Sequence, residues 1–242
     1  MNNVGIDAVR QGYAGDRCAA DLALRHDLGF EFWAVVTPLG ALGDRLVRHD
    51  VHDFHRAHDA RSVRLSQDGI AGRIHITCVM KRGLVGYGVA RLAEKFDTVI
   101  VDAGGQDSVE LRQAIAVCDY LLIPVRPSQW DVWSLNNMAA LVDEVASKTG
   151  EKINAHVVLN ACSTNRSVKE ADEVRSLIVT EYAAQFDVLR CQVCDRIAVR
   201  RAARDGLCVS ELDKSSADSK AQDEFEQIYQ EVFDEHWSAT HR

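Results

Sequence analysis

Short apolar runs rich in β-branched residues alternate with segments of helical periodicity through most of this sequence. The clearest apolar runs lie at residues 73–79, 98–102, 120–125 and 156–160. Because they are apolar almost continuously, they predict strands that are buried on both faces. Helical patterns separate them, at about residues 84–95, 108–117, 132–147 and 168–184. This alternation predicts an α/β fold, in which a mostly parallel, twisted sheet carries helices on both faces.

Two of the predicted helices carry local signals. One helix begins with a predicted capping box, and the other carries an apolar stripe that predicts its buried face. At the start of the second helix, Asp107 is predicted to cap the first turn while Glu110 reaches back to it, as in a capping box. The last helix carries an apolar stripe at steps of three and four residues, formed by Phe225, Ile228, Tyr229, Val232 and Phe233. Such a stripe predicts packing against the body of the protein rather than a cofactor site.

Length and composition predict one soluble domain spanning residues 1–242. The chain has 242 residues, of which 47% are hydrophobic and 26% charged, and a single α/β core can reach about 250 residues. No run approaches the ~18 apolar residues that a membrane span needs. The first residues show no basic segment followed by an apolar stretch. We therefore expect a cytoplasmic protein with no membrane partner.

The cysteines and histidines are candidates for metal or redox chemistry. Seven cysteines, without a repeating framework, predict reduced thiols rather than disulfides. Cys191 and Cys194 form the only close pair, and because no second pair stands at zinc-site spacing, buried structural thiols are favoured over metal or redox use. Histidines recur every third residue at His49, His52, His55 and His58. Such steps drift around a helix, so four cannot meet on one face, and a solvated segment is favoured over a metal site.

Four motif segments follow one another from residue 96 onward. Residues 96–108 (FDTVIVDAGGQDS) end a buried strand with Asp102, then form a glycine turn and open a helix, which is the form of a Walker B strand. The segments that follow are residues 118–131 (CDYLLIPVRPSQWD), 157–160 (VVLN) and 195–207 (DRIAVRRAARDGL). In this order and at these spacings they resemble the ParA family of plasmid and chromosome partition ATPases, part of the ParA/MinD branch of P-loop proteins.

This resemblance covers about residues 74 to 209, and it implies an activity, cofactors and partners. The family binds and slowly hydrolyses ATP with Mg²⁺, forms an ATP-dependent homodimer, binds non-specific DNA as a dimer and responds to a ParB-like centromere-binding adaptor. By the same resemblance Asp102 is the Walker B acid, which holds the magnesium shell through water, and Asn160 falls at the family's purine contact. A polar strand end without a chemical role is the alternative for Asp102. Such a protein would be cytoplasmic and nucleoid-associated.

The phosphate-binding loop of the family is not intact in this sequence. Such a loop needs glycines that let backbone N–H groups face the phosphates, a lysine for the β and γ phosphates, and a Ser or Thr hydroxyl for magnesium. No lysine occurs before Lys81. The best positional match is residues 11–18 (QGYAGDRC), which contain Gly12 and Gly15. It lies between a possible short strand at residues 4–9 and a second strand at residues 29–38.

In this match the charged residues of the loop have the wrong chemistry for a phosphate site. Asp16 stands at the phosphate lysine and Arg17 at the magnesium hydroxyl. A carboxylate there would repel a polyphosphate by several kcal/mol in a low-dielectric pocket. Arg17 could clamp a phosphate but cannot ligate magnesium. The alternative is that residues 1–66 are a divergent or non-homologous part, while residues 67–242 form the well-matched part.

Four arginines form a basic stripe near the C-terminal region. They lie at steps of four, five and eight residues from the first, at Arg196, Arg200, Arg201 and Arg204. One helical face of this kind can grip DNA phosphates without reading bases, and the net charge of −8 permits such a local patch. Charge pairing with Asp195, Asp205 and Glu211 is the alternative.

Three functions are consistent with these features. The first is a ParA-like partition protein of plasmid or chromosome segregation, with ATP binding and hydrolysis coupled to dimerisation and DNA binding. The second is a non-hydrolysing pseudo-ATPase that keeps the fold as a dimerisation and adaptor-binding module. The third is a non-functional remnant whose N-terminus is foreign. Nucleotide binding separates the first two, and a cooperative melting transition counts against the third.

Overall fold

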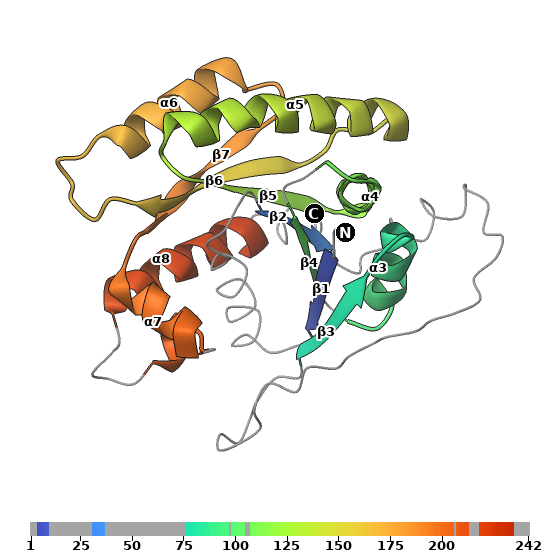
Figure 1. The fold of residues 1–242 in the computed structure, drawn as a ribbon, viewed down its shortest axis with the longest axis horizontal. Coiled ribbons are helices and arrows are strands. Elements are labelled where there is room, and N and C mark those ends of the chain that lie inside the picture. Colours follow the sequence, from blue (N-terminus) through green and yellow to red (C-terminus); the bar gives the residue numbers. More distant parts are fainter. Residues whose placement is uncertain are drawn as a thin grey trace.

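Seven strands form one sheet in the computed structural model, in the order β3-β1-β4-β2-β5-β6-β7 (Figure 1). The structure describes residues 4–9, 31–36, 76–96, 98–104, 107–205, 207–212 and 218–234. The strands are β1 (Val4–Val9), β2 (Glu31–Val36), β3 (Ile76–Lys81), β4 (Thr98–Gly104), β5 (Tyr120–Val125), β6 (Ala155–Cys162) and β7 (Asp187–Cys194).

Five strands of this sheet run in one direction and two run against them. Strands β5, β6 and β7 pair parallel. Strand β2 is antiparallel to both β4 and β5, and β1 is antiparallel to both β3 and β4. Strands β3 and β4 therefore share the direction of β5 to β7. The predicted mostly parallel sheet is confirmed, and β1 and β2 are inserted into it as antiparallel strands.

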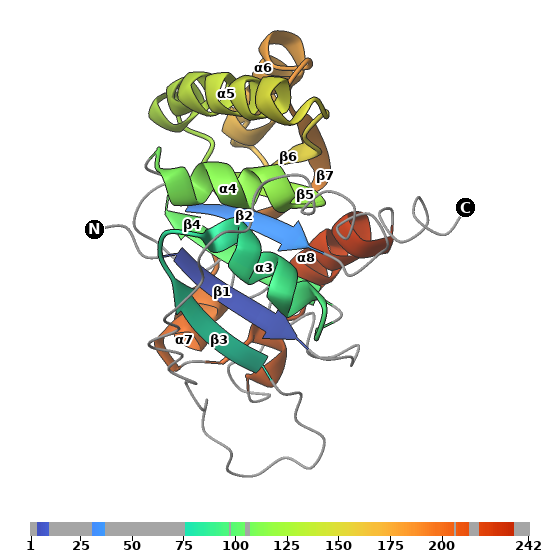
Figure 2. The ribbon, with the colours of Figure 1, turned by 90° about the vertical axis from the view of Figure 1, so that its right-hand side faces the viewer.

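Helices cover both faces of the sheet, as predicted (Figures 1 and 2). They are α3 (Val85–Ala93), α4 (Val109–Val117), α5 (Gln129–Thr149), α6 (Glu170–Glu181), α7 (Ile197–Asp205), η1 (Val209–Glu211), α8 (Ser219–Tyr229) and the π-helical turn η2 (Gln230–Asp234). Helices α3 to α6 pack on one face and contribute to the larger core cluster. Helices α7 and α8 pack with η1 and η2 on the other face. Within the described ranges, no helix is long and apolar enough to cross a membrane.

Strand residues supply the two cores alternately, because successive side chains of a strand point to opposite faces. In β5, Leu121 and Ile123 join the core under α3 to α6, whereas Tyr120 and Leu122 join the core under α7 and α8. All four are at most 6% exposed. The continuous apolar runs are therefore needed to fill two cores, as the sequence predicts.

The predicted elements agree with the observed ones except in local detail. The strand at residues 120–125 coincides with β5, whereas β4 continues past Asp102 to Gly104. The predicted cap of α4 is wrong by one residue: Ser108 is the N-cap, and its Oγ accepts a hydrogen bond from the Leu111 N–H at 3.1 Å. Asp107 instead pairs with Arg112, because the arginine offers this carboxylate two charge-assisted hydrogen bonds.

The apolar stripe of the last helix lies in the core. Phe225, Ile228, Tyr229 and Val232 are all at most 7% exposed, and the predicted packing role is confirmed for them. The side chain of Phe233 lies outside the described residues. Burial of this stripe fixes α8 across the half of the sheet that contains β7.

Candidate functional site

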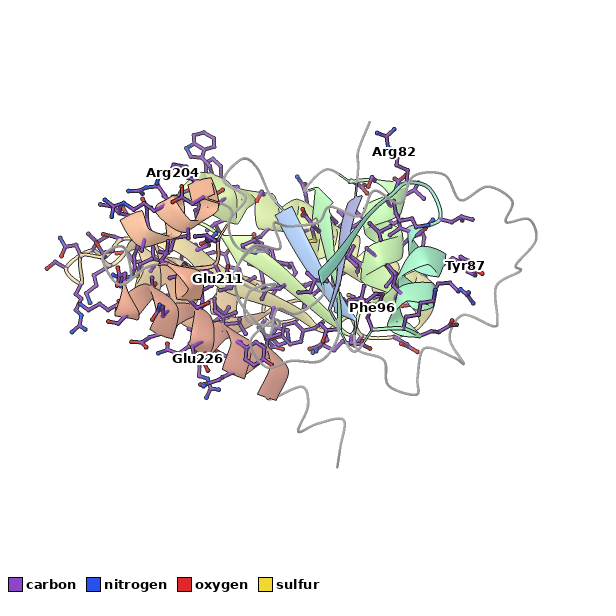
Figure 3. All side chains as sticks on the ribbon, turned by 90° about the horizontal axis from the view of Figure 1, so that it is seen from below. Arg82, Tyr87, Phe96, Arg204, Glu211 and Glu226 are labelled. Atoms are coloured by element: carbon purple, nitrogen blue, oxygen red, sulfur yellow. The ribbon has the colours of Figure 1, made fainter. Side chains whose placement is uncertain are left out.

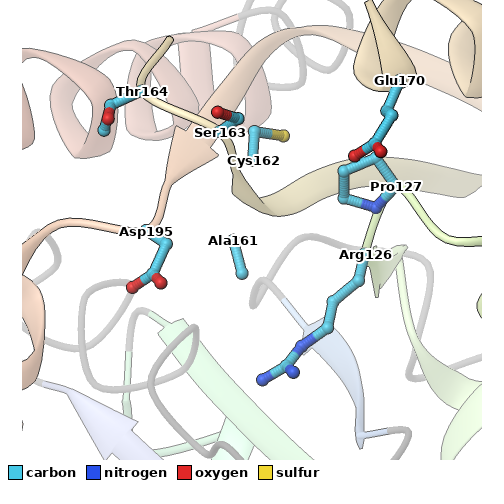
Figure 4. A pocket seen from close by; sticks show the side chains of 8 residues that line it. All are labelled: Arg126, Pro127, Ala161, Cys162, Ser163, Thr164, Glu170 and Asp195. Carbon is cyan, nitrogen blue, oxygen red and sulfur yellow. The ribbon is translucent and has the colours of Figure 1, made fainter. Parts of the chain in front are cut away.

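A pocket of about 350 Å³ lies where three parallel strands end (Figure 4). Arg126 directly follows β5 and Asp195 directly follows β7, while β6 contributes its last two residues, Ala161 and Cys162. The adjoining turns and α6 supply the other lining residues, Pro127, Ser163, Thr164 and Glu170. The carboxyl ends of parallel strands are where open α/β sheets bind ligands. The volume lies in the range of small-molecule pockets.

The end of β6 has an unusual backbone conformation at the pocket. Ala161 has a φ of 52°, which is left-handed and costs a residue other than glycine about 1–3 kcal/mol. The Ala161 N–H donates to Oδ1 of Asn160 at 2.8 Å, and the pairing register with β7 shifts on both sides of Leu159. The predicted purine-contact residue is thus bonded to a residue that lines the pocket.

The other walls of the pocket are held by short local hydrogen bonds. The Asp195 N–H donates to the carbonyl oxygen of Cys162 at 2.8 Å, which ties the ends of β6 and β7 together. After β5 the chain turns at Pro127 and enters α5, whose N-cap Ser128 accepts from the Asp131 N–H at 3.2 Å. These bonds position Arg126 and Asp195 from rigid elements rather than from a long loop.

Asp102 lies inside β4 rather than at its end. Its Cα pairs with that of Gly5 in β1 and with that of Trp33 in β2. Val101 and Ala103 belong to the core under α3 to α6, so the alternation of the strand places Asp102 on the other face. One strand, β2, separates β4 from β5, which puts the predicted Walker B acid about 10 Å across the sheet from the strand that leads to the pocket.

The predicted phosphate loop lies outside the described residues, including Gly12, Gly15, Asp16 and Arg17. The strand before it, β1, is described, and its direction bears on the site. Val9, the last residue of β1, pairs with Thr98 at the beginning of β4, whereas Asp102 pairs with Gly5 near the beginning of β1. The end of β1 therefore lies beside the beginning of β4. The pocket lies at the opposite ends of the strands, where β5, β6 and β7 finish.

The arginine stripe on and before α7 contains two kinds of side chain. Arg196 is largely buried, with 15% of its side chain exposed, and its Nη2 lies 2.6 Å from Oε1 of Glu224 on α8. This partner raises the pKa of Arg196. Arg204 is 73% exposed and pairs with Asp205 at 2.7 Å, and Figure 3 shows it at the outer surface of α7.

Charge pairing with neighbouring acidic residues, the alternative to DNA binding, accounts for the rest of the arginine stripe only in part. Arg200 pairs with Asp195 and remains 54% exposed, and Arg201 is exposed. The expected acidic partner Glu211 instead accepts the Cys208 N–H at 2.8 Å. Arg200, Arg201 and Arg204 thus remain on the surface, whereas Arg196 belongs to the packing of α7 against α8.

The cysteines of the described residues fit the structural role only in part. Cys118, Cys162, Cys191 and Cys194 are buried and form no disulfide, whereas Cys208 is disulfide-bonded, so the expectation of reduced thiols is wrong there. Cys191 and Cys194 belong to the cores on opposite faces of the sheet, because a spacing of three reverses the side of a strand. They cannot share a metal. No metal-binding cluster of His, Cys, Asp and Glu occurs among the described residues.

Most of the pocket lining was not predicted from the sequence. Arg126, Ser163, Thr164 and Glu170 were not singled out, and Asp195 was considered only as a partner for arginine. The available signal was positional: several of these residues directly follow the ends of predicted strands, where ligands of parallel sheets lie. Sequence reasoning alone cannot show which strand ends are neighbours.

The fold and the pocket define a class: α/β proteins with a pocket at the carboxyl ends of parallel strands, which is where open α/β sheets bind ligands. The chain is similar to the maintenance of carboxysome distribution protein A of Halothiobacillus neapolitanus. The two sequences are 31% identical over 137 residues. The match covers 56% of this chain and 60% of that protein. Together with the order of the motif segments, this match indicates that the chain is similar to the ParA/MinD family of P-loop proteins.

Partial matches also occur among solved structures. A Cyanothece McdA–ATP complex is 20% identical, with a TM-score of 0.40, covering 50% of this chain and 45% of its own. A Borrelia burgdorferi protein assigned to plasmid partition, bound to AMPPNP, is 19% identical, with a TM-score of 0.37, covering 53% and 46%. No family model matches the sequence. The chain spans about 60% of the length of its curated relative.

Proposed function

We propose that this chain is a ParA-like partition protein of plasmid or chromosome segregation, which binds an adenine nucleotide at the carboxyl edge of its sheet. The observation that carries the proposal is the pocket formed by the ends of β5, β6 and β7. Asn160, at the family's purine position, is hydrogen-bonded to Ala161 in the lining of this pocket. The base of the nucleotide would be held there by Asn160, Arg126 and Asp195.

Two observations favour binding of the nucleotide through its base over binding through an intact phosphate-binding loop. No lysine precedes Lys81 in the sequence, so the phosphates lack their usual cation. Strand β1 ends at the edge of the sheet opposite Asp102. We therefore favour the non-hydrolysing pseudo-ATPase over a working ATPase. In the working form, Asp102 would hold Mg²⁺ through water, and Gly12, Gly15 and Arg17 would approach the phosphates.

The partners proposed for this protein are a second copy of itself, a ParB-like adaptor and non-specific DNA. Among the described residues, six of the seven exposed large apolar side chains lie where helices follow strands, and only Val179 lies elsewhere, late in α6. The six are Leu84, Val109, Trp130, Trp133, Val168 and Ile197. These strands are parallel, so the side chains lie along the same edge as the pocket. An apolar edge of this kind supports self-association there. The protein would act in the cytoplasm, associated with the nucleoid through the exposed arginines of α7.

The test is a calorimetric titration of the whole chain with adenosine, AMP and ATP, each with and without Mg²⁺. Binding through the base predicts affinities for adenosine and ATP within about tenfold, independent of Mg²⁺. A working phosphate site would favour ATP far more, because each charge-assisted hydrogen bond contributes about 1.5–3 kcal/mol. Strong Mg²⁺-dependent preference for ATP would therefore contradict binding through the base alone, and release of phosphate from that ATP would contradict the pseudo-ATPase form.

A pair of tryptophan variants locates the binding. Ser163 is an exposed pocket residue, and Ser163→Trp is expected to abolish binding by filling the pocket. Ser167→Trp is the matched control, because Ser167 lies exposed in the same connection between β6 and α6 without lining the pocket. The absence of heat with all three ligands, or equal loss in both variants, would contradict nucleotide binding at this pocket.

A further inference from the structure

Two free cysteines end neighbouring strands at the wall of the pocket. Cys162 is the last residue of β6 and Cys194 the last residue of β7, and their Cα atoms are direct partners in the register of the two strands. Both are free and belong to the core under α3 to α6. Cys162 lines the pocket, and so does Asp195, the residue after Cys194.

Their placement meets the backbone requirement for a disulfide bond. Neighbouring strands lie about 4.8 Å apart, within the 4.4–6.8 Å range of Cα separations found across disulfides. The Asp195 N–H bonded to the Cys162 carbonyl oxygen at 2.8 Å keeps the two strand ends in this register. By contrast, Cys191 belongs to the core on the other face of the sheet and cannot reach Cys162 without turning its strand over.

We propose that Cys162 and Cys194 are a dithiol site, which a low-molecular-weight disulfide such as oxidised glutathione converts into an intramolecular disulfide. The thiolate of Cys194, the less buried of the two with 8% exposure against 0%, attacks one glutathione sulfur and releases the first glutathione thiol. The thiolate of Cys162 then attacks the Cys194 sulfur of this mixed disulfide and displaces the second glutathione. The two protein sulfurs are oxidised, one glutathione disulfide is reduced, and both thiol protons pass to the released glutathione.

The surroundings of both thiols make this reaction slow at neutral pH and faster in alkali. Burial, together with the smaller effect of the neighbouring Cys194, raises the pKa of Cys162 to about 12. The pKa of Cys194 is also raised, first by burial and then by its hydrogen bond to Glu224. Since the thiolate is the attacking form, the rate of cross-linking is expected to rise about tenfold per pH unit below these pKa values. The product would join two walls of the pocket covalently.

Peptide mapping of the folded chain after exposure to oxidised glutathione tests the proposal. Trypsin cleaves after Lys152, Arg166, Arg190 and Arg196, so Cys162 lies in the peptide 153–166 and Cys194 in the peptide 191–196. We expect these two peptides to be joined before reduction and separate after it. The oxidised protein is also expected to melt at a higher temperature than the reduced protein, because the cross-link restricts the unfolded chain.

Serine variants assign the bond, since the peptide 191–196 contains two cysteines. Cys194→Ser should abolish the joined peptide, whereas the matched control Cys191→Ser should keep it. Mapping of the wild-type chain decides even if a variant does not fold. A mixed disulfide with glutathione that never closes, or a joined peptide that disappears in Cys191→Ser and persists in Cys194→Ser, would overturn the proposal. None of these outcomes depends on nucleotide binding.

Discussion

At the scale of single residues, burial divides the arginine stripe into a structural member and surface members. Arg196 is enclosed by two acidic residues of the last helical region, with Glu224 at 2.6 Å and Asp218 at 3.7 Å. Glu224 also accepts the Cys194 N–H at 3.0 Å. When one partner of a buried ion pair is removed, the carboxylate that remains is uncompensated, and the folded protein is strongly destabilised. The stripe that looks uniform in sequence therefore combines an internal ion pair with an exposed basic surface.

This division predicts opposite phenotypes for neighbouring arginines. Arg196→Ala should lower the free energy of unfolding by about 3 kcal/mol, because it leaves Glu224 buried without its cation. The double change Arg200→Glu with Arg201→Glu should leave stability within about 1 kcal/mol while weakening DNA binding and reducing the salt slope of log K by about 2. Urea unfolding and a salt titration of DNA binding measure the two effects. Unchanged DNA binding at low salt would exclude α7 as the DNA surface.

At the scale of elements, α8 protects the free edge of the sheet. Strand β7 stands at the end of the strand order, and an edge strand presents backbone donors that can pair with another chain. Oε1 of Glu231, in η2 directly after α8, accepts the Arg190 N–H at 2.7 Å, and its Oε2 accepts the Cys191 N–H at 3.0 Å. Glu224 accepts the Cys194 N–H from the same helical region. These carboxylates satisfy donors of β7, beyond which the described part of the chain places no further strand.

The carboxylate of Glu231 should make stability depend on pH. Burial by itself raises the pKa of Glu231, but the N–H groups of Arg190 and Cys191 outweigh it and lower the pKa below 4.5. A lowered folded-state pKa contributes stability above the unfolded-state pKa of about 4.5, which is lost as pH falls through the folded value. Glu231→Gln should therefore cost about 2 kcal/mol at pH 7 and progressively less below pH 4.5.

Denaturant unfolding of the wild type and the variant from pH 7 to pH 3 measures this effect. Asp223→Asn is the matched control, because Asp223 lies on the exposed side of α8. A difference between wild type and Glu231→Gln that stays constant over this range would contradict a role of the ionised carboxylate. Increased self-association of Glu231→Gln would show that the edge has been opened.

At the scale of the whole molecule, the two cores share four strands of the sheet. Strands β4, β5, β6 and β7 contribute residues to both clusters. Loss of either core therefore removes half of the packing of the same strands, which couples the two faces. This arrangement favours one cooperative unit over two independent halves.

Shared strands predict a single cooperative melting transition for the whole chain. Calorimetric and van't Hoff enthalpies of unfolding should agree. With about 0.7 kcal/mol per residue near 60 °C, a fully folded chain of this length should absorb on the order of 170 kcal/mol. An enthalpy near half that value, or a broad transition without a heat-absorption peak, would support the remnant with a foreign N-terminus.

The layers of this protein, and most of its strands and helices, could be predicted from local patterns in the sequence. Periodicity is a local property, so the continuous apolar run that became β5 and the i, i+3, i+4 stripe of α8 could be assigned without knowing their neighbours. The motif order also indicated the family, and the absence of an early lysine predicted a defective phosphate site. Asn160, the predicted purine contact, lies inside β6 and is hydrogen-bonded to the pocket residue Ala161.

Strand direction, the residues that line the pocket and the role of each arginine follow from contacts between distant segments. Whether β1 runs with or against β4 depends on pairing between residues about 95 positions apart, and an apolar strand can pair in either direction. The pocket joins residues that follow β5, β6 and β7, and their proximity arises from strand order rather than from sequence spacing. Arg196 differs from Arg204 because α8 folds back beside it. Such contacts are set by burial and pairing between distant segments, which no local pattern contains.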